Sequence, residues 1–147
     1  MEREGNRSLP ADFVRFAIVG GIGFIVDAGI LSALVSWFGL NVYASRAVSF
    51  SIAVLATWAL NRQWVFGDWK ARHASAVGAE YVRYVVVQTV GALTNLAVFV
   101  AVLVAVPDLI RYPVVPLAIG AVAGLLVNFA GARLWVFARN ATLPKVR

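Results

Sequence analysis

A chain of 147 residues in which 61% are hydrophobic and only 14% are charged is too apolar for a soluble domain, where about a quarter are charged. A net charge of +6 suggests nucleic-acid binding in a soluble protein, but in a membrane protein it reflects basic residues at the cytoplasmic surface. The lack of cysteine excludes a disulfide framework, a thiol nucleophile and a cysteine metal site. The composition therefore predicts an integral membrane protein with no nucleic-acid partner.

Four apolar runs follow a polar N-terminal segment. A helix needs about 20 residues to cross the hydrocarbon core, and the runs cover about residues 13–38, 43–60, 81–106 and 114–129. We therefore predict an all-α fold with four transmembrane helices. Residues 1–12 are expected to form a cytoplasmic tail, 13–138 the membrane domain and 139–147 a basic cytoplasmic tail. The polar connection 67–80 is expected to lie along the headgroups.

Two of the runs are closed by an arginine that is followed two residues later by a tryptophan. Arg62 and Trp64 close the second run, and Arg133 and Trp135 close the fourth. Arginine reaches the phosphate layer while the indole lies at headgroup level, so the pattern indicates a membrane exit.

Lysine and arginine are distributed unevenly about the predicted spans. The chain has 13 of them, and only Arg46 and Arg111 lie on the side opposite the exits, which leaves 11 on the exit side. Because basic residues collect on the cytoplasmic side, both termini are predicted to be cytoplasmic.

The two halves of the chain resemble each other. Phe13-Val14-Arg15-Phe16 matches Tyr81-Val82-Arg83-Tyr84, Gly23 matches Gly91, Asp27 matches Asn95, and Arg62-Gln63-Trp64-Val65-Phe66 matches Arg133-Leu134-Trp135-Val136-Phe137. Each half holds two spans, so both halves enter the membrane from the same side. The chain is therefore predicted to consist of two parallel two-helix repeats.

Asp27 is the only acid expected inside a span. An ionised group at mid-membrane costs at least about 2.5–3.5 kcal/mol on insertion scales, so it normally has a partner or a task. Arg46 opens the second span at a depth from which it can bend toward Asp27. Such a site can hold a lipid phosphate through paired N–H donors. The alternatives are a structural ion pair, or an Arg46 side chain that reaches the outer headgroups.

Five further polar side chains complete the predicted substrate-binding set. Asn95 is expected to form a second wall of the site, and Asn128 lies within the last span; helix–helix hydrogen bonding is the alternative for both. Asn61 and Arg62 are candidates for an inner phosphate-binding point with Arg133 as the matching residue. Simple anchoring at the cytoplasmic surface is the alternative for the arginines.

The ordered set of these residues resembles the GtrA-like family of small four-span membrane proteins. The resemblance covers about residues 13–137 and is carried by Arg15-Phe16, Gly20, Gly23, Asp27, Ala44, Arg46, Ser49, Asn61-Arg62-Gln63-Trp64-Val65-Phe66, Asn128-Phe129 and Arg133-Leu134-Trp135-Val136-Phe137. Thr57-Trp58 stands where the family favours Asn-Phe, and Ala132 where an Asn would precede the arginine. These departures weaken the transfer of any role given to those amides.

The resemblance implies a part in the synthesis of cell-surface polysaccharide at the bacterial inner membrane. The expected function is flipping of a polyprenyl-phosphate-linked sugar; the alternative is a non-transporting partner that recruits or stabilises a polyprenyl-phosphate glycosyltransferase. A third possibility is export of a small solute with Asp27 as proton carrier, which a neighbouring Arg46 disfavours because it stabilises the ionised carboxylate.

No nucleophile–base pair, metal cluster or phosphate loop stands out in the sequence, so we expect no enzyme activity, no cofactor and no metal. Four helices in a chain of 15.8 kDa make a thin wall around a polar headgroup. A homo-oligomer, in the simplest case a dimer, is therefore expected.

Overall fold

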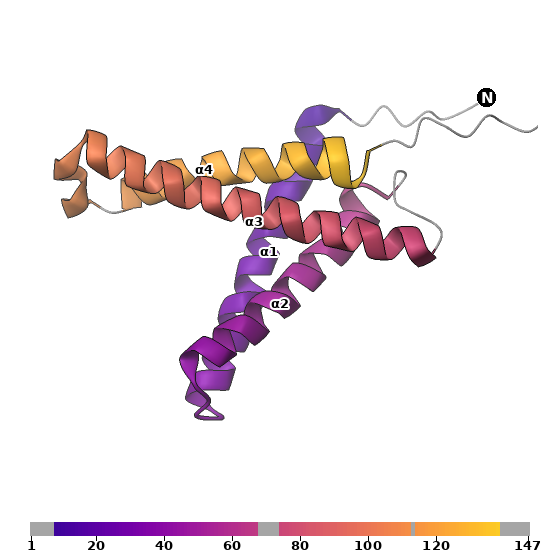
Figure 1. Cartoon of the computed structure of the whole chain (residues 1–147), viewed down its shortest axis with the longest axis horizontal. Helices are drawn as coiled ribbons and strands as arrows, with labels where there is room; N and C mark the ends of the chain where they lie inside the picture. Colours follow the sequence, from indigo (N-terminus) through magenta and orange to yellow (C-terminus); the bar gives the residue numbers. More distant parts are fainter. Residues whose placement is uncertain (1–7, 68–73, 113, 139–147) are drawn as a thin grey trace, which may run out of the picture. The chain divides into compact units, whose positions relative to one another are not determined.

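The computed structural model describes residues 8–67, 74–112 and 114–138. In that part of the chain, four helices are long and apolar enough to cross a membrane: α1 (Leu9–Ser36), α2 (Val42–Leu60), α3 (Ala74–Ala105) and α4 (Val114–Gly131). The prediction of an all-α membrane protein with four transmembrane helices is confirmed. The chain divides into two compact units, Met1–Lys70 and Ala71–Arg147, and each unit is a pair of helices packed along each other (Figure 1).

The first unit turns sharply between its two helices. Gly39 has a φ of +63°, in the left-handed region that glycine adopts without steric cost. Asn41 then caps α2: its side-chain oxygen accepts hydrogen bonds from the backbone N–H groups of Tyr43 at 2.9 Å and Ala44 at 3.2 Å. The two antiparallel helices are thereby joined by a five-residue connection, residues 37–41.

Helix α3 begins earlier than the sequence suggested. The stretch 67–80 was expected to be a polar connection, but α3 already starts at Ala74. The expectation is wrong for residues 74–80 because this stretch contains Ala74, Ala76 and Ala79, and alanine has the highest helix propensity. His73 and the rest of residues 68–73 lie outside the described part. In the second unit a short 3₁₀ helix, η2 (Pro107–Arg111), occupies most of the connection between α3 and α4.

Close packing at glycine holds each pair of helices together. In a membrane, helices associate through van der Waals contact and interhelical hydrogen bonds rather than through burial from water. A Cβ atom at Gly23 of α1 would lie 2.3 Å from Cγ2 of Thr57 in α2. In the second unit, a Cβ atom at Gly124 would lie 2.7 Å from the backbone carbonyl oxygen of Gly91. These glycines therefore set how closely the helices approach.

Replacing Gly124 by alanine is expected to destabilise the second unit by about 1–3 kcal/mol, because the methyl group would meet backbone that cannot rotate away. The matched control is Gly78→Ala in α3, where nothing lies within 4 Å of an added Cβ atom. A thermal melt of both variants in the same detergent provides the test. Equal melting temperatures for the two variants would contradict this packing.

Several contacts within the first unit recur at equivalent positions within the second unit. Phe16 and Phe66 pack edge-to-face with ring centroids 6.3 Å apart, and the rings of Tyr84 and Phe137 lie 6.4 Å apart. Helices α2 and α4 both continue into a π-helical segment, η1 (Asn61–Val65) and η3 (Ala132–Val136). In each unit a backbone hydrogen bond of 2.8 Å closes this segment. The sequence similarity between the halves thus corresponds to similar packing within them.

Candidate functional site

A polar cluster lies between α1 and α2, in otherwise apolar surroundings. Asp27 comes from α1, and its carboxylate Oδ2 accepts a hydrogen bond from Nη1 of Arg46 in α2. The carboxylate of Asp27 is mostly enclosed, with a side-chain exposure of 13%, whereas the Arg46 side chain is 54% exposed. The structure therefore brings together the two residues whose pairing was expected from the sequence.

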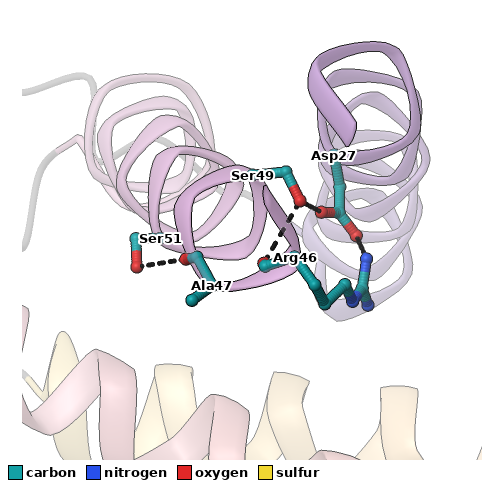
Figure 2. A network of polar contacts seen from close by, with 5 residues as sticks. All are labelled: Asp27, Arg46, Ala47, Ser49 and Ser51. Carbon is teal, nitrogen blue, oxygen red and sulfur yellow. Dashed lines mark hydrogen bonds and ion pairs between the residues drawn. The ribbon is translucent and has the colours of Figure 1, made fainter. Parts of the chain in front are cut away.

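Ser49 is the third member of the cluster, one turn after Arg46 on α2. Its hydroxyl donates to Oδ1 of Asp27 at 2.7 Å and also lies 3.2 Å from the backbone carbonyl oxygen of Arg46. The residue is completely buried. Figure 2 shows Ser49 on one side of the carboxylate and the Arg46 guanidinium on the other. The cluster consequently has one short, buried donor and one long, exposed donor.

The cluster lies toward the end of the unit where the two helices are joined. Ser49 is seven residues after Val42, the start of α2, which corresponds to about 10 Å along the axis. Trp37 and Tyr43 at the joined end are each 83% exposed, as expected for side chains at headgroup level. Arg46 is therefore close enough to that level for a lipid-borne anion to reach it.

The other end of α2 holds the second candidate pair. Asn61 and Arg62 both lie in η1, where Asn61 is buried and Arg62 is partly exposed. The guanidinium carbon of Arg62 lies 5.7 Å from the ring centroid of Trp58, one turn earlier, which is within cation–π range. Since 16 residues separate Arg46 from Arg62, the two arginines lie at opposite ends of the helix, about 24 Å apart along its axis.

The candidates of the second unit are amides at the helix interface and one arginine. Asn95 packs on Gly120, and Asn128 packs on Gly91, so both amides sit in the α3–α4 contact. Arg133 lies in η3, equivalent to Arg62 in η1. Asn95 also lines an open pocket of about 270 Å³, together with Ala92, Leu96, Phe99 and Leu117.

Two buried acids were missed at the sequence level. Asp12 in the first turn of α1 is 1% exposed, and Glu80 in α3 is 2% exposed. The expectation that Asp27 is the only acid within a helical span is therefore wrong, because α1 and α3 begin before the apolar runs. The repeat carried a signal: Asp12 directly precedes Phe13, and Glu80 directly precedes the matching Tyr81.

The described residues contain no group of three or more His, Asp or Glu side chains that could hold a metal ion. The family model described as "GtrA/DPMS, transmembrane domain" matches residues 15–139, most of the chain. The chain belongs to this family. The match includes α2 and α4 with both π-helical exits, most of α1 and all of α3.

Membership in the GtrA/DPMS family gives the site its chemical context. The family is linked to the handling of lipid-linked sugars, and its membrane domain is in general not a catalytic fold. A GtrA/DPMS domain with four apolar helices is a multi-pass membrane protein. The ion pair between α1 and α2 places a cation that is able to bind an anionic group among apolar helices.

Proposed function

We propose that this protein translocates a polyprenyl-phosphate-linked sugar across the bacterial inner membrane for the synthesis or modification of cell-surface polysaccharide. The observation that carries this proposal is the Asp27–Arg46–Ser49 cluster. A cation placed between apolar helices, with half of its side chain exposed, suits a ligand with one anionic group and a long apolar tail.

Arg46 supplies the chemistry for the phosphate. A guanidinium has five N–H donors in a planar fork and binds phosphate oxygens in pairs. Only Nη1 is engaged with Asp27 among the described contacts of Arg46, and Figure 2 shows the other guanidinium nitrogens directed away from the carboxylate. The phosphate binds at these donors, while the polyprenyl tail stays in the hydrocarbon.

Further polar residues take part at other stages of the passage. Arg62 in the first unit, with Asn61 beside it in η1, and Arg133 in the second unit each bind the phosphate at the cytoplasmic end. Asn95 and Asn128 offer amide groups to the sugar hydroxyls. The residues of the proposed substrate site are Asp27, Arg46, Asn61, Arg62, Asn95, Asn128 and Arg133. A homodimer fits this proposal, because the four transmembrane helices described in one copy form only a thin wall around a polar headgroup.

Transport by the purified protein in liposomes tests the proposal. A polyprenyl-phosphate hexose with a fluorescent label on its sugar is placed in both leaflets, and a membrane-impermeant quencher reports the label that remains inside. Loss of protected fluorescence with the protein, and its persistence in protein-free liposomes, is the expected result. If the protein leaves the label protected but raises the activity of a co-reconstituted polyprenyl-phosphate glycosyltransferase, the accessory function replaces transport.

The proposal also requires cytoplasmic termini, which can be examined by cysteine labelling because the chain has no cysteine of its own. Cysteine at Leu40 or Asp108, both exposed in connections between helices, should react with an impermeant maleimide added to intact cells. Cysteine at the exposed Ala76 should react only after the cells are opened. Reaction at Ala76 in sealed cells would rule out this orientation.

A further inference from the structure

The two donors that hold the Asp27 carboxylate differ in length and in exposure. Ser49 has a relative exposure of 0% and a short side chain, whose hydroxyl reaches Oδ1 of Asp27 and the backbone carbonyl oxygen of Arg46. Arg46 has a long side chain that is 54% exposed, and Asp27 is its one side-chain partner among the described contacts. When a ligand enters this cluster, Arg46 is therefore the side chain expected to move, while Ser49 and Asp27 stay in place.

A phosphate that binds Arg46 brings a second anion to a guanidinium that already holds a carboxylate. Like charges at one site disfavour each other strongly in a medium of low dielectric constant. The phosphate and the carboxylate of Asp27 consequently compete for Arg46. Ser49 makes this competition possible, because its 2.7 Å hydrogen bond remains with the carboxylate when the arginine turns away.

We infer that Asp27 is a competing anion that the phosphate of the substrate displaces from Arg46, and that Ser49 is the positioning residue that holds Asp27 during the exchange. The inference rests on the proposed function. The empty site contains the Arg46–Asp27 pair and the loaded site an Arg46–phosphate pair. Return of Arg46 to Asp27 then promotes release of the headgroup, which a carrier needs as much as binding.

The exchange predicts opposite effects for two small substitutions. Asp27→Asn removes the competing charge, so an anionic lipid should bind more tightly. Ser49→Ala leaves Arg46 and Asp27 in place but removes the donor that supports the carboxylate in the loaded site. Displacement of Arg46 then costs more, and the same lipid should bind more weakly. A purely structural ion pair predicts no such difference in sign.

The experiment measures binding of farnesyl methyl phosphate, a phosphodiester with one negative charge, by calorimetry. The protein is held in nanodiscs of phosphatidylcholine, which carries no net charge, and farnesyl methyl ether serves as the uncharged probe. We expect the dissociation constant of the phosphodiester to fall about fivefold in Asp27→Asn and to rise about fivefold in Ser49→Ala. In the double variant, Ser49→Ala should add nothing to Asp27→Asn.

Ser51→Ala is the matched control. The Ser51 hydroxyl is exposed and donates to the carbonyl oxygen of Ala47 in its own helix at 2.8 Å, so it takes no part in the cluster (Figure 2). This variant should bind like the parent protein. If Ser49→Ala also binds like the parent, the role given to Ser49 is overturned.

The Arg46→Ala variant shows whether a negative result contradicts the anion exchange or the phosphate site itself. Loss of phosphodiester binding in Arg46→Ala together with unchanged or weaker binding in Asp27→Asn would overturn the exchange and leave the phosphate site standing. Unchanged binding in Arg46→Ala would remove the phosphate site itself. Should Asp27→Asn fail to fold, the comparison of Ser49→Ala with Ser51→Ala still decides, because neither changes a charge.

Discussion

Transport of a polyprenyl-phosphate-linked sugar is expected to be lost in Arg46→Ala and partly kept in Arg46→Lys. Hydrogen bonds to a charged group are worth about 1.5–3 kcal/mol, so removing the guanidinium should lower transport at least about tenfold. Lysine keeps the positive charge, but it lacks the planar fork that binds two phosphate oxygens at once. The measurement is the initial rate of quenching in the liposome assay, at equal amounts of reconstituted protein.

Arg111→Ala provides the control for this substitution. Arg111 is the other arginine that the sequence predicts on the side of the membrane opposite the exits, and it lies exposed in η2. Its loss changes the net charge of the chain by the same amount without touching the cluster. Normal transport in Arg46→Ala, with the protein folded and correctly inserted, would remove Arg46 from the substrate site. An equal loss in both variants would point to a general effect of charge.

The spans and the Asp27–Arg46 contact could be predicted because each depends on a simple property of the sequence. Apolar length predicts a spanning helix whatever its neighbours are. An acid and a base at similar depth inside the apolar runs of adjacent spans have a strong electrostatic reason to meet. The bounds of α2, Val42–Leu60, accordingly agree with the apolar run to within one residue.

Other features could not be predicted because they depend on packing rather than on composition. Hydropathy places the start of a helix where the apolar run starts, so Asp12 and Glu80 were attributed to polar segments although both are buried. The π-helical turns η1 and η3 shift one backbone hydrogen bond, and no residue type marks such a shift. Ser49 was visible in the sequence, but its bond to Asp27 required the register of α1 against α2.

Expression of Asp27→Asn is expected to be nearly normal, whereas Arg46→Gln should fold less well. An asparagine at position 27 can still accept a hydrogen bond from the guanidinium and from Ser49. Removing the arginine instead leaves a carboxylate that is 13% exposed with Ser49 as its remaining described donor. We expect this to cost about 1–3 kcal/mol, less than for a fully buried pair because Arg46 itself is half-exposed.

Combining the two changes, Asp27→Asn with Arg46→Gln, should restore folding without restoring transport. The stranded carboxylate is gone, so expression and melting temperature should return toward those of the parent protein. No cation remains in the cluster to bind the phosphate, so transport should stay at the level of Arg46→Gln. This combination separates the contribution of the ion pair to folding from its contribution to phosphate binding. Removing both charges can restore folding, but it cannot restore binding of the phosphate.

A proton-carrier role for Asp27 predicts a different pattern. In that case Asp27→Asn alone should abolish transport driven by a pH gradient, because the amide cannot take up and release a proton. The phosphate site predicts that this single variant still transports, more slowly if release of the headgroup has become limiting. Transport by each single variant and by the double variant, with and without a pH gradient across the liposome membrane, distinguishes the two. Full activity of the double variant would exclude both roles and leave Asp27 and Arg46 as residues that only hold α1 against α2.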